Sequence, residues 1–168
     1  MLESGSSTDA AAERLIARRR QRLERILQRR LTRPPASGIS ERRRRFLREE
    51  AEELYWNELS WEQLTGEEGL AESGLVEFTF PGFLAMVDGL LLSEAMPDAM
   101  VPATPRPEVV EDVLEFLARR RLALDASSEE DDRMEARVIT RLMDLVLYRL
   151  HGVQVEEVER LERAPEDG

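Results

Sequence analysis

The first part of the chain repeats apolar residues at helical spacing and places arginines on the opposite side. The apolar side consists of Leu15, Ile16, Leu23, Ile26 and Leu27. The basic side consists of Arg14, Arg18, Arg22, Arg25 and Arg29. This spacing predicts a basic amphipathic helix that begins near Asp9. Residues 1–8 are small and polar, which predicts disorder, and the prolines and glycine of residues 32–40 predict a linker after the helix.

The middle of the chain shows the helical pattern in shorter stretches. Ser40 is placed to cap a second helix, whose apolar stripe includes Phe46, Leu47 and Leu54. Residues 60–63 (SWEQ) fit a capping box for a short further helix. Residues 75–80 alternate apolar and polar side chains, but a lone strand without a partner is unstable, which favours an extended lead-in.

Prolines, serines and glycine mark the ends of the C-terminal helices. Pro81 suits the first turn of one helix, and another follows the four prolines of residues 97–107. Residues 127–130 (SSEE) form a capping box for a long helix that Gly152 ends, and a short last helix follows. We therefore predict an all-α protein, with a compact, bundle-like body of three to five helices preceded by the basic amphipathic helix.

Charge follows the same division of the chain. Residues 1–48 hold 14 of the 24 arginines and five acidic residues, whereas the remaining residues hold ten arginines and thirty acidic residues. We predict a disordered N-terminus (1–8), a basic helix and linker (9–39), an acidic helical domain (40–163) and a disordered tail (164–168). The chain thus combines a cationic arm with an acidic body.

The second predicted helix has its charges in an unfavourable order. Residues 42–45 are four arginines in the first turn, and residues 49, 50, 52 and 53 are glutamates further along. A helix dipole favours acidic residues at the start and basic residues at the end. Some requirement other than the stability of the isolated helix must therefore explain these arginines.

The chain lacks the residues that most classes of catalytic site need. The chain has neither cysteine nor lysine, which removes thiol chemistry, thiolate zinc sites and the lysine of a phosphate-binding loop. The single histidine, His151, precedes Gly152 at a predicted helix end, where capping explains it better than catalysis. The carboxylate pairs Glu49/Glu53 and Asp131/Glu135 share helical faces, but neighbouring charges indicate solvated surface. We predict no enzymatic activity and no cofactor.

Hydropathy gives no sign of a membrane segment. The most apolar run, residues 80–92, contains Asp88 and is shorter than the roughly 20 residues that cross a bilayer. Residues 18–20 are arginines, which stand where a signal peptide would have its apolar segment. We therefore expect a cytoplasmic protein without an integral membrane segment.

The basic arm has four interpretations. Its leucines and isoleucines could enter a groove on another protein, which would order a helix that is marginal alone. Residues 14–48 could instead bind nucleic acid, although Phe46 is the only aromatic residue there and the acidic body repels polyanions. Adsorption to a membrane surface lacks the aromatic residues that usually accompany it. The arm could also fold back on the acidic body.

Trp56 is a separate candidate for binding. It lies about 100° from the apolar stripe of its helix, so it is either an interface anchor or packed beneath the short helix that follows. We predict a non-catalytic protein–protein interaction module, an accessory or assembly subunit that docks on another protein through its Arg-rich and acidic helices. The partner is a different protein or a second copy, and the alternative is a small regulator that binds nucleic acid through the arm. The candidate contacts are Leu15, Ile16, Leu23, Ile26, Leu27, Arg18, Arg22, Arg25, Arg29 and Trp56.

Overall fold

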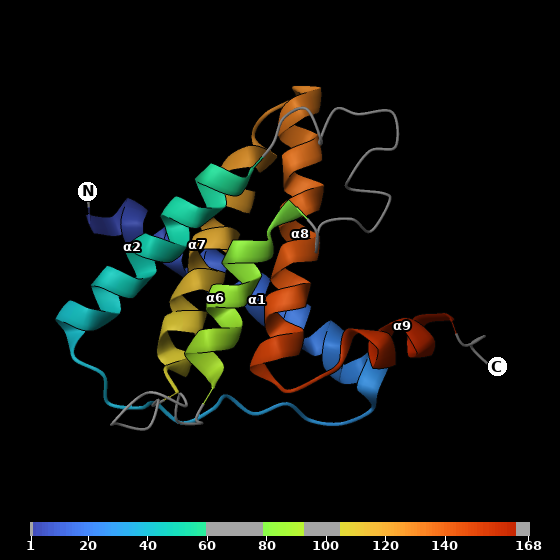
Figure 1. The fold of residues 1–168 in the computed structure, drawn as a ribbon. Coiled ribbons are helices and arrows are strands. Elements are labelled where there is room, and N and C mark those ends of the chain that lie inside the picture. Colours follow the sequence, from blue (N-terminus) through green and yellow to red (C-terminus); the bar gives the residue numbers. More distant parts are fainter. Residues whose placement is uncertain (1, 60–78, 93–104, 164–168) are drawn as a thin grey trace.

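A computed structural model describes residues 2–59, 79–92 and 105–163, with the backbone alone described at residues 2–8 and 162–163. Its helices are α1 (Leu2–Leu27), α2 (Glu41–Glu58), α6 (Pro81–Leu91), α7 (Pro107–Asp125), α8 (Glu130–Leu150) and α9 (Val155–Arg163) (Figure 1). The prediction of an all-α protein is confirmed. The predicted short helix at residues 60–63 and most of the alternating stretch lie outside the described residues.

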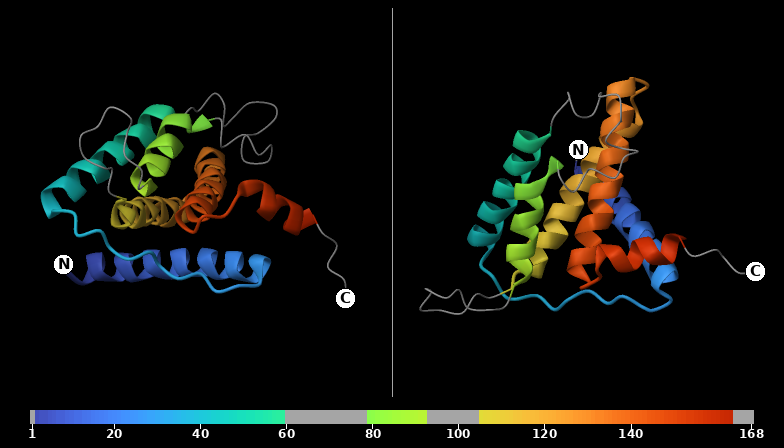
Figure 2. Two further views of the ribbon diagram at one scale, coloured as in Figure 1. Left: turned by 60° about the horizontal axis from the view of Figure 1, so that its bottom comes forward. Right: turned by 45° about the vertical axis from the view of Figure 1, so that its right-hand side comes forward.

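The helices form three layers, and α7 and α8 make up the middle layer. Figure 2 shows α2 and α6 on one side of this central pair and α1 on the other. The contacts agree, because α2 packs on α6 and α7, whereas α1 packs on α7, α8 and α9. The central helices are accordingly the most deeply buried, and Val113, Leu117, Leu142 and Leu145 are almost fully enclosed. A helix covered on several sides needs apolar residues around most of its circumference, as α8 has.

Several helix ends follow the local signals in the sequence. The Ser40 side chain caps α2 by accepting a hydrogen bond from the backbone N–H of Arg43 (3.2 Å). Pro81 occupies the first turn of α6. Gly152 follows α8 with a φ of +66°, and the next residue, Val153, donates its backbone N–H to the carbonyl of Tyr148 (2.7 Å). This is the glycine-dependent helix stop that the sequence predicts.

The predicted capping box of α8 is wrong. The helix begins at Glu130 and its N-cap is Glu129, which makes no side-chain cap hydrogen bond. The hydroxyl of Ser127 accepts a hydrogen bond from the backbone N–H of Glu129 (3.2 Å), so it stabilises the preceding turn instead. Three acidic residues in the first turn of α8, Glu130, Asp131 and Asp132, favour this start through the helix dipole.

Helix α1 starts earlier and ends earlier than the periodicity predicts. It begins at Leu2, although residues 1–8 were expected to be disordered. It ends at Leu27 because Gln28 adopts a φ of +54°, and the backbone N–H of Arg29 then bonds to the carbonyl of Glu24 (3.2 Å). The sequence gives little indication that α1 ends here, because glutamine rarely takes this left-handed conformation.

Candidate interaction surface

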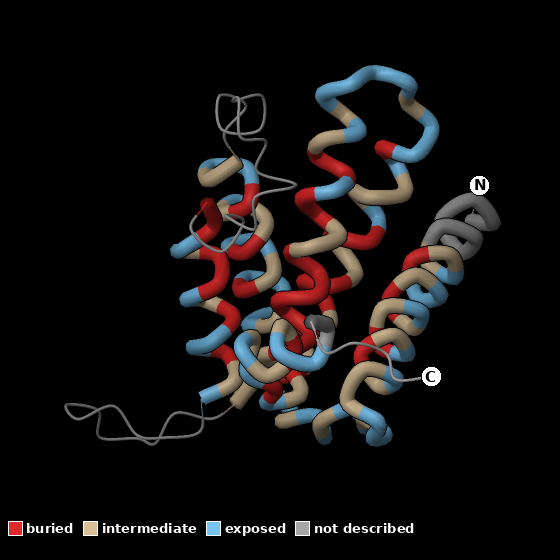
Figure 3. The backbone as a smooth tube through the Cα atoms, turned by 90° about the vertical axis from the view of Figure 1, so that its right-hand side faces the viewer, coloured by how far each residue is buried: buried red, intermediate tan, exposed pale blue. Residues whose placement is uncertain are grey.

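The apolar side of α1 is part of the protein's own core. Ile16 and Leu23 are buried, the latter with 1% of its surface exposed, and Leu15, Ile26 and Leu27 are partly buried against the same cluster. Figure 3 shows buried positions recurring along α1 on the side that faces the other helices. These five residues, which the sequence offered as a docking face for a partner, are therefore already covered by the chain itself.

Arginines on the flanks of α1 pair with the acidic body. Arg19 contacts Asp144 through two hydrogen bonds, one of them from Nε to Oδ1 (2.9 Å), and Arg22 lies 3.6 Å from the same carboxylate. Arg20, which is buried, reaches Glu111 (3.3 Å). Of the predicted basic contacts, Arg18, Arg25 and Arg29 are exposed to solvent and Arg22 is half-buried. The basic arm and the acidic body thus form ion pairs with each other within one molecule.

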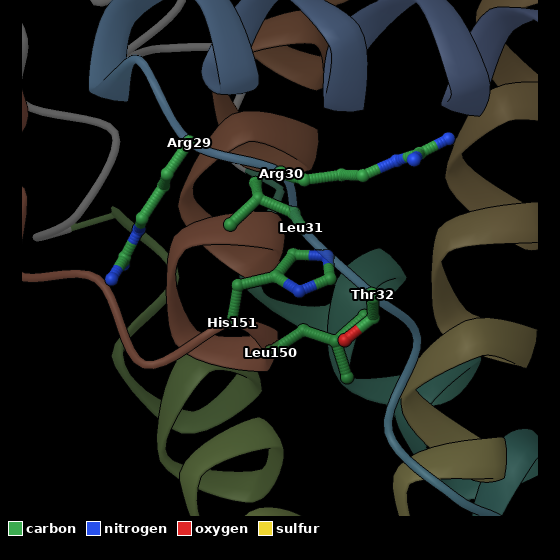
Figure 4. A pocket seen from close by; sticks show the side chains of 6 residues that line it. All are labelled: Arg29, Arg30, Leu31, Thr32, Leu150 and His151. Carbon is green, nitrogen blue, oxygen red and sulfur yellow. The ribbon is translucent and has the colours of Figure 1, made fainter.

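His151 lies in a small polar cavity between the ends of α1 and α8. The cavity has a volume of about 290 Å³ and is lined by Arg29, Arg30, Leu31, Thr32, Leu150 and His151. Figure 4 shows the side chains of Arg29 and Arg30 pointing in different directions, so their charges do not converge on one point. His151 Nε2 accepts a hydrogen bond from Arg20 Nε (3.0 Å). This geometry makes the cavity a poor anion site, and its lining includes no carboxylate to orient the imidazole.

Burial and the nearby charge of Arg20 lower the pKa of His151 to about 4. The imidazole is therefore neutral at physiological pH, which agrees with its role as acceptor from Arg20. The predicted interaction of an imidazolium with the helix end is replaced by a hydrogen bond between α8 and α1. Glu24 and Arg29 also face this histidine, the first raising its pKa and the second lowering it.

A pH titration of stability tests this assignment. The folded pKa of His151 lies below the ordinary value of 6.5, so its contribution is fully present above pH 6.5 and is lost as pH falls toward 4. We expect His151→Gln, whose amide oxygen can still accept from Arg20, to flatten the fall in unfolding free energy across this window. Urea melts of both proteins at intervals of pH measure the difference. Parallel curves for the two proteins would contradict a neutral, buried His151.

A buried ionic cluster joins α2, α7 and α8. Glu135 is 0% exposed, accepts a hydrogen bond from the Tyr55 hydroxyl (2.7 Å) and receives two from Arg120 (2.8 and 2.9 Å). Burial and the Glu135 carboxylate raise the pKa of Tyr55, which keeps its hydroxyl protonated and donating. The interpretation of Glu135 as solvated surface is therefore wrong, since the first turn of α8 is exposed but the second is covered by α7.

This cluster holds Trp56 in place at the surface. The Arg120 guanidinium lies 5.0 Å from the centre of the Trp56 ring, and the Tyr55 and Phe116 rings meet it edge-on at 5.1 and 6.5 Å. Trp56 nevertheless remains 48% exposed. The second interpretation of Trp56, packing beneath a following helix, concerns residues outside the described ranges.

The outward face of α2 carries a second exposed aromatic residue. Phe46 is 49% exposed, and its described neighbour across the ring is Arg43, at 5.2 Å from the ring centre. The outward residues Arg42, Phe46, Glu49, Glu53 and Trp56 alternate steps of four and three, which aligns them along one side of the helix. Helix α2 packs on the body through the other side, where Leu47, Ala51 and Tyr55 are buried.

Charges on this face are segregated along the helix. Arg42, Arg43 and Arg45 are exposed near its start, and the exposed glutamates of its later half are Glu49, Glu50 and Glu53. Within the described part of the chain, no salt bridge is formed by Arg42, Arg45, Glu49 or Glu53. We call the residues 42, 43, 45, 46, 49, 50, 53 and 56 the α2 face. The sequence pattern grouped Phe46 with Leu47 in one apolar stripe, which is wrong, because the body covers the side of Leu47 and leaves Phe46 exposed.

Comparisons with known proteins give no further assignment. No family model matches the chain, and neither a curated protein nor a solved structure matches it. Within the described ranges, no helix is long and apolar enough to cross a membrane. The same residues contain no group of three or more histidines and carboxylates arranged to hold a metal ion.

Proposed function

We propose that this protein is a non-catalytic protein–protein interaction module that docks through the α2 face. The observation that carries the proposal is the pair of half-exposed aromatic side chains, Phe46 and Trp56, on one line of a helix whose outward charges lack salt-bridge partners in the described structure. Tryptophan and arginine are the residue types most enriched where binding energy concentrates. The proposal moves the docking site from α1, whose apolar residues are buried, to α2.

The contacts that hold Trp56 in one orientation support the same conclusion. Trp56 is oriented by Arg120, which is itself held by two hydrogen bonds to the buried Glu135. A side chain that is already fixed loses little entropy when a partner covers it, so more of its contact energy appears as affinity. The buried cluster that contains Glu135 and Arg120 thus orients Trp56, the exposed residue that we expect a partner to cover.

Nucleic-acid binding remains the second candidate, because Arg14, Arg18 and Arg25 form an exposed line on α1. The observations favour protein docking, since Arg19, Arg20 and Arg22 are engaged with the body and no aromatic side chain accompanies the exposed line. Steeply salt-dependent binding to DNA or RNA that is lost in Arg14→Glu/Arg18→Glu would favour this alternative.

Site-specific crosslinking tests the proposal when the purified protein is labelled first and then added to an extract of the native cell. The chain has no cysteine, so Glu50→Cys on the α2 face and Gln21→Cys on the exposed side of α1 each give one attachment point for a photocrosslinker. We expect Glu50→Cys to form an adduct with one defined protein, identified by mass, and Phe46→Ser to reduce this adduct about tenfold or more. Equal labelling from both positions, or an adduct from α1 alone, would contradict docking through α2.

A further inference from the structure

The charges on the α2 face are complementary to those of the same face in a second copy that runs in the opposite direction. Within the α2 face, the three exposed arginines 42, 43 and 45 come first and the three exposed glutamates 49, 50 and 53 follow, with Phe46 between them. A second α2 laid alongside in the opposite direction would place glutamates opposite arginines at both ends. Such self-complementarity is what a two-fold symmetric interface requires, because the same patch must serve both partners.

We propose that the partner of the α2 face is a second copy of this chain, bound through an antiparallel α2–α2 pair. This inference rests on the proposed function and identifies its partner. The two-fold axis passes level with Leu47 and Arg48. Arg42 then lies level with Glu53 of the second copy, and Arg45 with Glu50 of the second copy. The Phe46 side chains of the two copies meet close to the axis.

Helix dipoles give an independent reason for this arrangement. In a single chain, the arginines at the start of α2 and the glutamates toward its end both oppose the helix dipole. In the antiparallel pair, each arginine cluster lies beside the glutamates and the negative helix end of the other copy. The charge order that is unfavourable in one chain therefore becomes favourable in two, which a partner of unrelated sequence would not explain.

Size limits the strength of the dimer. An α2 of 18 residues is about 27 Å long. One pair of such helices buries less surface than a standard protein interface, so we expect half-association at roughly micromolar to tens of micromolar concentration.

Two charge-reversed variants test the inference when analysed separately and mixed. Arg42→Glu/Arg45→Glu makes the α2 face acidic, and Glu50→Arg/Glu53→Arg, which reverses the two glutamates level with these arginines, makes it basic. In sedimentation velocity, we expect the parent to dimerise and each variant alone to associate at least about tenfold more weakly. The equimolar mixture should associate at least as well as the parent, because one acidic face meets one basic face. Both variants agree better with the helix dipole than the parent, so circular dichroism should show them folded.

A matched control and an orientation test complete the experiment. Arg14→Glu/Arg18→Glu makes the same change of charge on exposed α1 residues and should leave dimerisation unchanged. In the parent, a short crosslinker should join Glu49→Cys to its counterpart, whereas the two copies of Asn57→Cys should stay unlinked, about 28 Å apart along the pair. Efficient linkage of both positions would mean a parallel pair and would overturn the proposal.

Other results of these dimerisation and crosslinking experiments also test the inference. A parent that stays monomeric at roughly 100 µM, variants that dimerise as it does, or a mixture that stays monomeric would each overturn the inference. A monomeric parent whose Glu50→Cys adduct contains a different protein would refute the second copy as partner while leaving docking through the α2 face intact. Loss of both dimer and adduct would refute the two together.

Discussion

Replacing Glu135 with alanine is expected to lower the free energy of unfolding by about 3–5 kcal/mol. The side chain is fully buried and accepts hydrogen bonds from the Tyr55 hydroxyl and twice from Arg120. Its removal leaves the hydroxyl without its acceptor and the guanidinium without its counterion, partly shielded from water. For a chain of this length, each kcal/mol corresponds to roughly 2–4 °C in the thermal midpoint, so differential scanning calorimetry should show a drop of about 6–20 °C.

A triple variant separates the cost of a broken ion pair from the value of an intact one. In Tyr55→Phe/Arg120→Met/Glu135→Leu all three polar groups are replaced by apolar groups of comparable shape. Such replacements of a whole buried network are often nearly neutral, so the triple variant should be more stable than Glu135→Ala. If Glu135→Ala itself changed the unfolding free energy by less than about 0.5 kcal/mol, the carboxylate would be solvated, as its sequence neighbours suggested.

Local signals explain why much of the fold could be predicted. Apolar periodicity marks each described helix, and Ser40, Pro81 and Gly152 act on the backbone within a few residues of themselves. Such signals depend little on the rest of the chain. The capping box at residues 127–130 failed because two turn conformations compete for the same serine, and the choice depends on where α7 ends.

The burial of a residue and its partners in the fold could not be predicted in the same way. Arg19 meets Asp144, which is 125 positions away, and no local pattern in either segment indicates that the two residues pair. Glu135 follows a run of exposed acidic residues and differs from them only by the helix that covers it. For α1 the pattern showed an apolar side, but periodicity is identical whether the covering surface belongs to the same chain or to another. The candidate site consequently shifted from α1 to α2.

Leu23→Asp is expected to destabilise the whole protein, rather than only weaken partner binding as the interpretation of α1 as a docking arm requires. Leu23 is 1% exposed in the core that α1 shares with the rest of the molecule. Truncating a buried leucine costs about 2–5 kcal/mol, and a carboxylate placed there without a partner adds to that cost. The ion pairs of Arg19 and Arg20 with the body would be lost with the helix.

The exposed Gln21 provides a matched control on the same helix. Gln21→Asp introduces the same carboxylate two positions away, where it should change the unfolding free energy by no more than about 0.5 kcal/mol. Any difference between the two variants therefore reports burial and not the helix propensity or charge of aspartate.

The central claim, that α1 belongs to one cooperative body and leaves α2 as the docking face, is tested most directly by thermal unfolding of the Leu23→Asp chain. We expect a single transition whose midpoint lies about 10–20 °C below that of the parent, with Gln21→Asp close to the parent. A Leu23→Asp midpoint equal to that of the parent would contradict the claim, because α1 would then be an independent arm whose apolar side is free to bind a partner.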